Sequence, residues 1–98
     1  MNKALSIVAA AALMSTMAMA KEIKIGVVLP LTGPIAAFGQ TSKGGLDVAY
    51  EQNNKLKNGD TVKLIILDDR GDKAEAATAV KRLINKDGVT VILGEVAS

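Results

Sequence analysis

Apolar residues recur along this chain with two different periods, and the change of period predicts five elements. Residues 23–29, 62–67 and 89–93 are short apolar runs rich in valine, isoleucine and leucine. Such runs are typical of strands that are covered on both faces of a parallel sheet. Between them, residues 40–54 and 73–86 carry apolar side chains at three- and four-residue spacing, which indicates amphipathic helices. The pattern therefore predicts the element order β-α-β-α-β.

Turn-forming and helix-breaking residues separate these elements. Pro30 ends the first strand because it has no N–H to donate to a neighbour. Asp72, with a glutamate three positions later, has the spacing of a capping box and is expected to cap the second helix. Gly88 is placed to end that helix in a left-handed conformation. Gly44 and Gly45 are poor helix formers, and we expect them to allow the first helix to approach the strand or a neighbouring loop closely.

The connections between the strands are short, and this restricts the topology. Because crossovers between neighbouring parallel strands are almost always right-handed, the three strands should be parallel, with the order 2-1-3 as the simplest arrangement. The loop after the first strand, residues 30–39, and the loop after the third, residues 94–98, then flank a crevice at the carboxyl ends of the strands. Ligands of open α/β sheets bind in such a crevice.

The first 20 residues are predicted to be a cleavable signal peptide. Lys3 supplies a positive start, residues 4–14 are apolar apart from one serine, and Ala18-Met19-Ala20 matches a signal-peptidase site. A membrane anchor or a buried helix is the alternative, but the alanine-rich segment is short for a span of about 20 residues. We therefore expect cleavage after Ala20 and export to the periplasm.

Composition and charge argue against several classes of function. Removing Lys3 with the leader lowers the formal net charge from +2 to +1, and the remaining charges are interspersed. A nucleic-acid surface would need clustered basic residues and aromatics, whereas Phe38 and Tyr50 are the only aromatic residues. The absence of cysteine also argues against a lipid-anchored exported form.

No catalytic or cofactor motif is recognisable. The chain has no histidine or cysteine, and the glycines after the first strand match neither a dinucleotide fingerprint nor a P-loop. Asp68, Asp69 and Asp72 could be read as a metal cluster, but their spacing does not match a calcium loop. We expect Asp72 to cap a helix and the other two to end a strand in water. The sequence thus predicts no enzyme, no metal and no cofactor.

Four stretches, taken in order, resemble a known family: IKIGVVLPLTGPIAAFGQTSKGG, LDVAYEQNN, LDDRGDKAEAATAVKRLI and VTVILGEVAS. They resemble the start of a type I periplasmic binding protein of the branched-chain amino acid type. The pattern departs from the family at residues 56–59, where a longer glycine-rich turn is common. Since 78 residues after the leader are few for such a domain, and the last strand pattern lies close to Ser98, we interpret residues 21–98 as an incomplete N-terminal lobe.

The resemblance implies a function and four ligand-binding residues. It implies a monomeric solute receptor that captures an amino acid, branched-chain as in the family, and delivers it to an ABC permease in the inner membrane. Phe38 matches a position that packs on the ligand's side chain, with packing on its own lobe as the alternative. Val96, Ala97 and Ser98 match the segment that holds the ligand's carboxylate and amino group. A sensory receptor ectodomain or a secreted enzyme on a similar lobe remains the alternative function.

Overall fold

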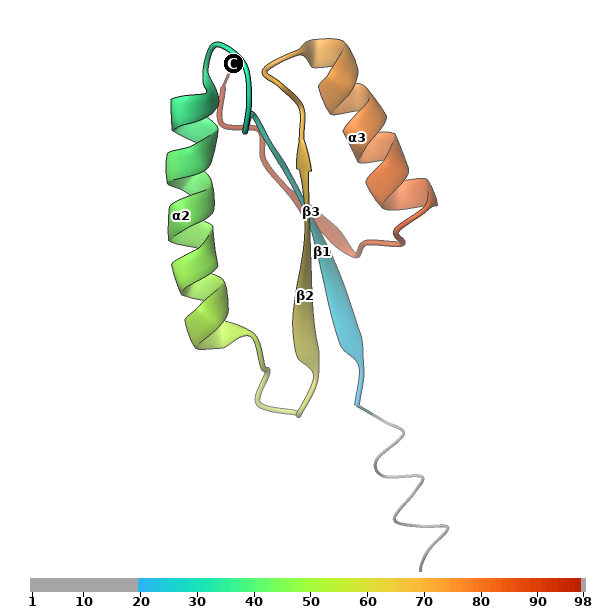
Figure 1. Ribbon diagram of the computed structural model, residues 1–98. Helices are drawn as coiled ribbons and strands as arrows, with labels where there is room; N and C mark the ends of the chain where they lie inside the picture. Colours follow the sequence, from blue (N-terminus) through green and yellow to red (C-terminus); the bar gives the residue numbers. More distant parts are fainter. Residues whose placement is uncertain (1–19, 98) are drawn as a thin grey trace, which may run out of the picture.

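The computed structural model describes residues 20–97, so the predicted signal peptide, apart from Ala20, and Ser98 lie outside the described residues. The elements are the strands and helices labelled in Figure 1: β1 (Glu22–Leu29), α2 (Ala36–Asn53), β2 (Thr61–Asp68), α3 (Lys73–Asn85) and β3 (Val91–Leu93). The predicted order is confirmed. Within residues 20–97, no helix has the length and apolar character needed to cross a membrane.

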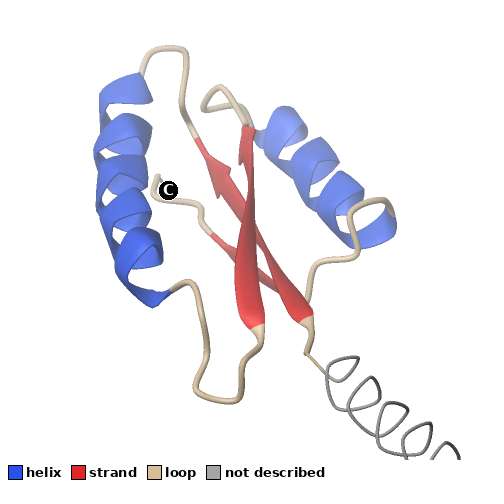
Figure 2. Ribbon diagram, turned by 60° about the horizontal axis from the view of Figure 1, so that its bottom comes forward, coloured by secondary structure: helices blue, strands red, loops and turns tan. Residues whose placement is uncertain are grey.

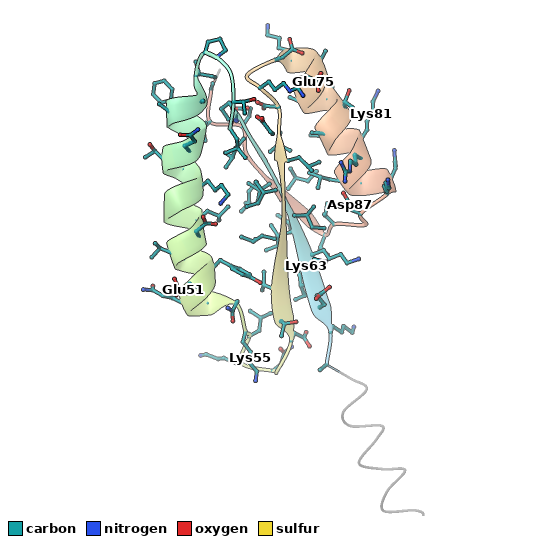
Figure 3. All side chains as sticks on the ribbon, in the orientation of Figure 1. Glu51, Lys55, Lys63, Glu75, Lys81 and Asp87 are labelled. Atoms are coloured by element: carbon teal, nitrogen blue, oxygen red, sulfur yellow. The ribbon has the colours of Figure 1, made fainter. Side chains whose placement is uncertain are left out.

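The three strands form one parallel sheet in the order β2-β1-β3, as predicted. β1 is central and pairs with β2 along its whole length, from Glu22 opposite Thr61 to Leu29 opposite Asp68. Figures 1 and 2 show α2 and α3 on opposite faces of the sheet. Charged residues such as Glu51 on α2 and Lys81 on α3 are exposed and point away from the sheet (Figure 3).

The core between α3 and the sheet is built around Leu83, which is fully buried. Leu83 rests on the strand at Gly26, where an added Cβ would lie 2.8 Å from a Leu83 methyl group. Ile84 fits the apolar spacing of residues 73–86 and would be expected on this buried face, but 57% of its surface is exposed, whereas Ala79 is buried. The helix contacts the sheet along positions 76, 79, 80 and 83, and Ile84 lies about 100° further around the helix than Leu83.

The first helix begins earlier than predicted, at Ala36 rather than Gln40. Its first turn forms directly after the Gly/Pro loop, where the Phe38 N–H donates to the Ile35 carbonyl (3.1 Å). The sequence analysis placed Gly39 in the loop after the first strand, but Gly39 is a buried residue of α2. The prediction was wrong because this glycine serves packing between the helix and the preceding loop.

Close approach of α2 depends on Gly39 and not on the glycine pair that we predicted for it. A Cβ built on Gly39 would lie 2.0 Å from the Pro30 carbonyl oxygen. The same construction at Gly44 or Gly45 meets no atom within 4 Å. The helix therefore approaches the sheet at its first turns, next to the loop that follows β1.

The ends of α3 confirm the predicted capping residues. The Asp72 carboxylate accepts a hydrogen bond from the Glu75 N–H (3.0 Å), and Gly88 has a φ of +64°. The Val89 N–H donates to the Leu83 carbonyl (3.2 Å), so Val89 still belongs to the helix exit. β3 consequently begins at Val91, two residues later than predicted.

The amino end of the sheet is fastened by Asp60, which precedes β2. Its carboxylate accepts from the Lys21 N–H (2.9 Å), and the Thr61 N–H donates to the Lys21 carbonyl (2.9 Å). Asn58 also donates its side-chain amide to Asp60 (3.1 Å). An aspartate thus stands at each end of β2, Asp60 just before it and Asp68 as its last residue.

Candidate functional site

Three segments meet where the parallel strands end, at the carboxyl edge of the sheet (Figure 1). They are the loop after β1 (residues 30–35), the turn after β2 (residues 69–72) and the segment after β3 (residues 94–97). Their meeting follows from the topology, because parallel strands end at the same edge. This is the edge at which the sequence predicted a crevice.

Asp68 joins the first two segments through four hydrogen bonds. Its Oδ1 accepts from the backbone N–H groups of Leu31 (2.8 Å), Thr32 (3.2 Å) and Arg70 (2.8 Å). Its Oδ2 accepts from the Thr32 hydroxyl (2.6 Å). The Thr32 hydroxyl, assisted by the three N–H donors, lowers the pKa of Asp68 to about 2. The carboxylate is therefore ionised throughout the neutral range.

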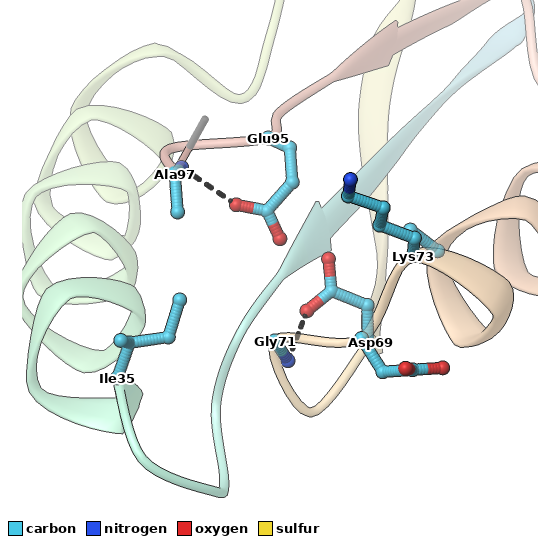
Figure 4. Close-up of a pocket in the computed structure, with 8 residues that line it drawn as sticks. Ile35, Asp69, Gly71, Lys73, Glu95 and Ala97 are labelled. Carbon is cyan, nitrogen blue, oxygen red and sulfur yellow. Dashed lines mark hydrogen bonds between the residues drawn. The ribbon is translucent and has the colours of Figure 1, made fainter.

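Asp69 and Glu95 join the turn after β2 to the segment after β3. Asp69 is only 1% exposed, and its Oδ1 accepts from the Gly71 N–H (2.8 Å). Its carboxyl group faces that of Glu95, which itself accepts from the Ala97 N–H (2.9 Å) (Figure 4). Burial, together with the hydrogen bond to Glu95, raises the pKa of Asp69, and the bond from Asp69 lowers the pKa of Glu95. Asp69 is therefore the member of the pair that binds a proton more readily.

A hollow of about 160 Å³ opens beside this carboxyl pair. It lies between all three segments, and its lining residues are Ile35, Asp69, Gly71, Asp72, Lys73, Ala76, Glu95 and Ala97 (Figure 4). Complete small-molecule sites have volumes of about 300–1,000 Å³. The hollow thus has the size of one part of such a site. Among residues 20–97, no group of three or more acidic, histidine or cysteine side chains could hold a metal ion.

The sequence model of the periplasmic binding protein family matches residues 22–98, which is nearly all of the chain after the predicted leader. The chain belongs to the periplasmic binding protein family. A Leu/Ile/Val-binding protein from Rhizobium johnstonii is 35% identical over 79 residues, and a Leu/Ile/Val-binding protein homolog from Brucella melitensis is 38% identical over 79 residues. Both alignments cover 79% of this chain and 21% of the relative.

Solved structures of periplasmic binding proteins show the same fold. The leucine binding protein LivK from Thermotoga maritima has a TM-score of 0.74 and 46% identity, covering 78% of this chain and 21% of that one. The branched-chain amino acid transporter substrate-binding protein LivJ from Streptococcus pneumoniae, in complex with isoleucine, has a TM-score of 0.69 and 25% identity, covering 76% and 22%. The chain spans about a fifth of the length of these relatives. The predicted α/β fold of a type I periplasmic binding protein is confirmed.

Within this periplasmic binding protein fold, the predicted ligand residues are only partly brought together. Ala97 lines the hollow, and Val96 is 45% exposed beside it. Phe38 lies on the first turn of α2, and 67% of its surface is exposed among residues 20–97. Ser98 lies outside the described residues. Their role in binding stays a prediction.

Sequence reasoning missed what Asp68 and Asp69 do. We expected both to end β2 in water, but Asp69 is buried and Asp68 is saturated with hydrogen bonds from the neighbouring loop. Two acidic residues at the carboxyl end of a buried strand were the available signal. No local sequence pattern pointed to Glu95 as a site residue. Its neighbour Asp69 is distant in sequence and comes close only after the sheet has formed.

Proposed function

We propose that this protein is an extracytoplasmic solute-binding protein that captures an aliphatic amino acid. The observation that carries the proposal is the 35–38% identity, over 79 residues, to proteins named for leucine, isoleucine and valine binding. A likeness in fold would not be enough, since one fold hosts many functions. Here the match to the family model, over residues 22–98, also includes the segments that form the candidate site.

The proposed ligand lies against the carboxyl edge, between this lobe and a second one. Phe38 packs on the ligand's side chain, which explains why a large aromatic ring is exposed at the first turn of α2. The segment Val96, Ala97 and Ser98 holds the ligand's main-chain groups, with the Ser98 hydroxyl and N–H directed to the carboxylate. N–H groups at a helix start provide such an anion site. Binding of this kind requires no catalytic step.

The proposed partner is an ABC permease in the inner membrane, to which the closed, loaded protein delivers its amino acid. The protein acts as a monomer in the periplasm after its signal peptide has been removed at Ala20. Support for this address comes from the leader pattern and from the family to which the chain belongs. Closure of two lobes around a ligand would present a distinct surface to the permease.

A thermal-shift screen of the intact gene product tests the proposal, because a ligand that binds only the native state raises the melting temperature. We expect L-leucine, L-isoleucine or L-valine at about 1 mM to raise the melting temperature by several degrees. The free energy of unfolding should rise by roughly RT ln(1 + [L]/Kd). D-leucine is the matched control and should have a smaller effect. Equal shifts with both enantiomers, or none with any aliphatic amino acid, would refute the proposal. A membrane span and signalling domain in the same gene product would favour the sensory receptor.

A further inference from the structure

Asp68 has an unusually complete set of hydrogen bonds for a residue at a strand end. Both of its carboxylate oxygens are occupied, and three of the four donors belong to Leu31 and Thr32, on the loop after β1. Hydrogen bonds to an ionised carboxylate are stronger than those between neutral groups. Asp68, at the end of β2, therefore fixes the loop after β1 through hydrogen bonds, and does so more firmly than the contacts of an exposed loop alone would.

The loop that Asp68 holds is in turn joined to the beginning of α2. The Gln40 side chain donates to the Leu31 carbonyl (3.2 Å), and Gly39 lies directly against the Pro30 carbonyl. Gly33 also lies close to the Arg70 carbonyl oxygen, which an added Cβ would approach to 2.7 Å. The loop, the turn after β2 and the first turns of α2 thus form one interlocked unit.

Phe38 stands on the outer side of that unit, and its position depends on how the unit is held. Its side chain is 67% exposed, so few contacts of its own fix the ring. The backbone that carries it is fixed by the bonds that begin at Asp68. We propose that Asp68 is a positioning residue of the ligand cleft: it does not touch the ligand but holds the loop and helix start that present Phe38.

This inference rests on the proposed function, and it adds a residue to which no ligand role was predicted. A binding wall that is already ordered before the ligand arrives loses less entropy on binding, which improves affinity. Removing the Asp68 carboxylate should therefore weaken amino-acid binding. It should also reduce the preference among ligands with side chains of different size, even where the lobe stays folded. A purely structural role would lower stability without changing the preference among ligands.

The test compares four variants of the intact gene product with the wild type. Asp68→Ala removes all four acceptor bonds, while Asp68→Asn is the conservative variant that retains an acceptor oxygen. Thr32→Val removes only the hydroxyl bond and guards against misfolding of the alanine variant. Asp60→Ala is the matched control, because Asp60 performs a similar fastening at the opposite end of β2.

Titration calorimetry with L-leucine and L-alanine measures affinity and size preference together. We expect Asp68→Ala to raise the Kd for L-leucine about tenfold and to reduce the preference over L-alanine, as expected for a less ordered wall. Asp68→Asn and Thr32→Val should show smaller losses of the same kind. Asp60→Ala should lower the melting temperature and leave both Kd values unchanged. Wild-type preference in Asp68→Ala, or equal losses in Asp60→Ala, would overturn the inference.

Hydrogen exchange separates a failure of this inference from a failure of the proposed function. In the ligand-free protein, amides of residues 31–38 should exchange faster in Asp68→Ala and at the wild-type rate in Asp60→Ala. Unchanged exchange overturns the inference whether or not an amino acid binds. If the wild type binds neither amino acid, the proposed function is wrong and Asp68 serves no amino-acid site.

Discussion

Replacing Gly39 by alanine should destabilise the protein sharply, although alanine is the better helix former. The added Cβ would lie 2.0 Å from the Pro30 carbonyl oxygen and 2.5 Å from its carbon, and both are backbone atoms. No side-chain rotation can relieve this contact, so α2 or the loop must move by more than 1 Å. Overpacking of this kind costs about 1–3 kcal/mol and occasionally more. The gain in helix propensity offsets about 1 kcal/mol of that. Because the clash is with backbone atoms, we expect the cost to lie at the upper end of this range and the net loss to be about 2 kcal/mol.

Gly44→Ala and Gly45→Ala provide matched controls in the same helix. Neither added Cβ meets an atom within 4 Å, so only helix propensity changes, and each variant should gain about 0.5–1 kcal/mol. Urea unfolding of the ligand-free intact gene product, followed by circular dichroism, measures all three. A Gly39→Ala protein as stable as Gly44→Ala would show that the contact between α2 and Pro30 is not the tight one described here.

Three further predictions concern the site and the leader. Ser98→Ala should raise the Kd for the amino-acid ligand about ten- to a hundredfold, as expected for losing a bond to a charged group; a lower ligand-free melting temperature with unchanged affinity would instead make Ser98 a helix cap. Asp69→Asn should gain stability relative to the wild type as pH rises above 3.8, because a raised carboxyl pKa means that the folded state binds more protons and loses stability with rising pH. Unfolding curves between pH 4 and 8 check this, and a stability difference that does not change with pH would contradict the raised pKa of Asp69. Mass spectrometry of the exported protein should find Lys21 as the first residue, and an uncleaved form beginning at Met1 would refute the signal peptide.

Most of the fold could be predicted because it depends on periodicity, and periodicity is a local property. The apolar runs located all three strands, and the short connections between them led to the observed order β2-β1-β3. Predictions failed where a residue's role depends on a distant neighbour. We placed Gly39 in a loop because its contact with Pro30 forms only once α2 packs against the loop after β1. The sequence suggested an exposed strand end at Asp69, because its neighbour Glu95 lies beside it only once the sheet has formed.

The central strand of the sheet is also the first to leave the ribosome. β1 follows directly after the predicted leader, but its pairing partners come much later in the sequence. Glu22 pairs with Thr61, and Ile25 pairs with Val91. Sheet pairing between residues so far apart in sequence is slow, since the intervening chain must be closed into a loop first. Until residues 61–93 are available, the strand next to the leader has no partner within the described sheet. Because the middle strand of the sheet comes first among the three described strands, the sheet can form only after residues 61–93 have been made.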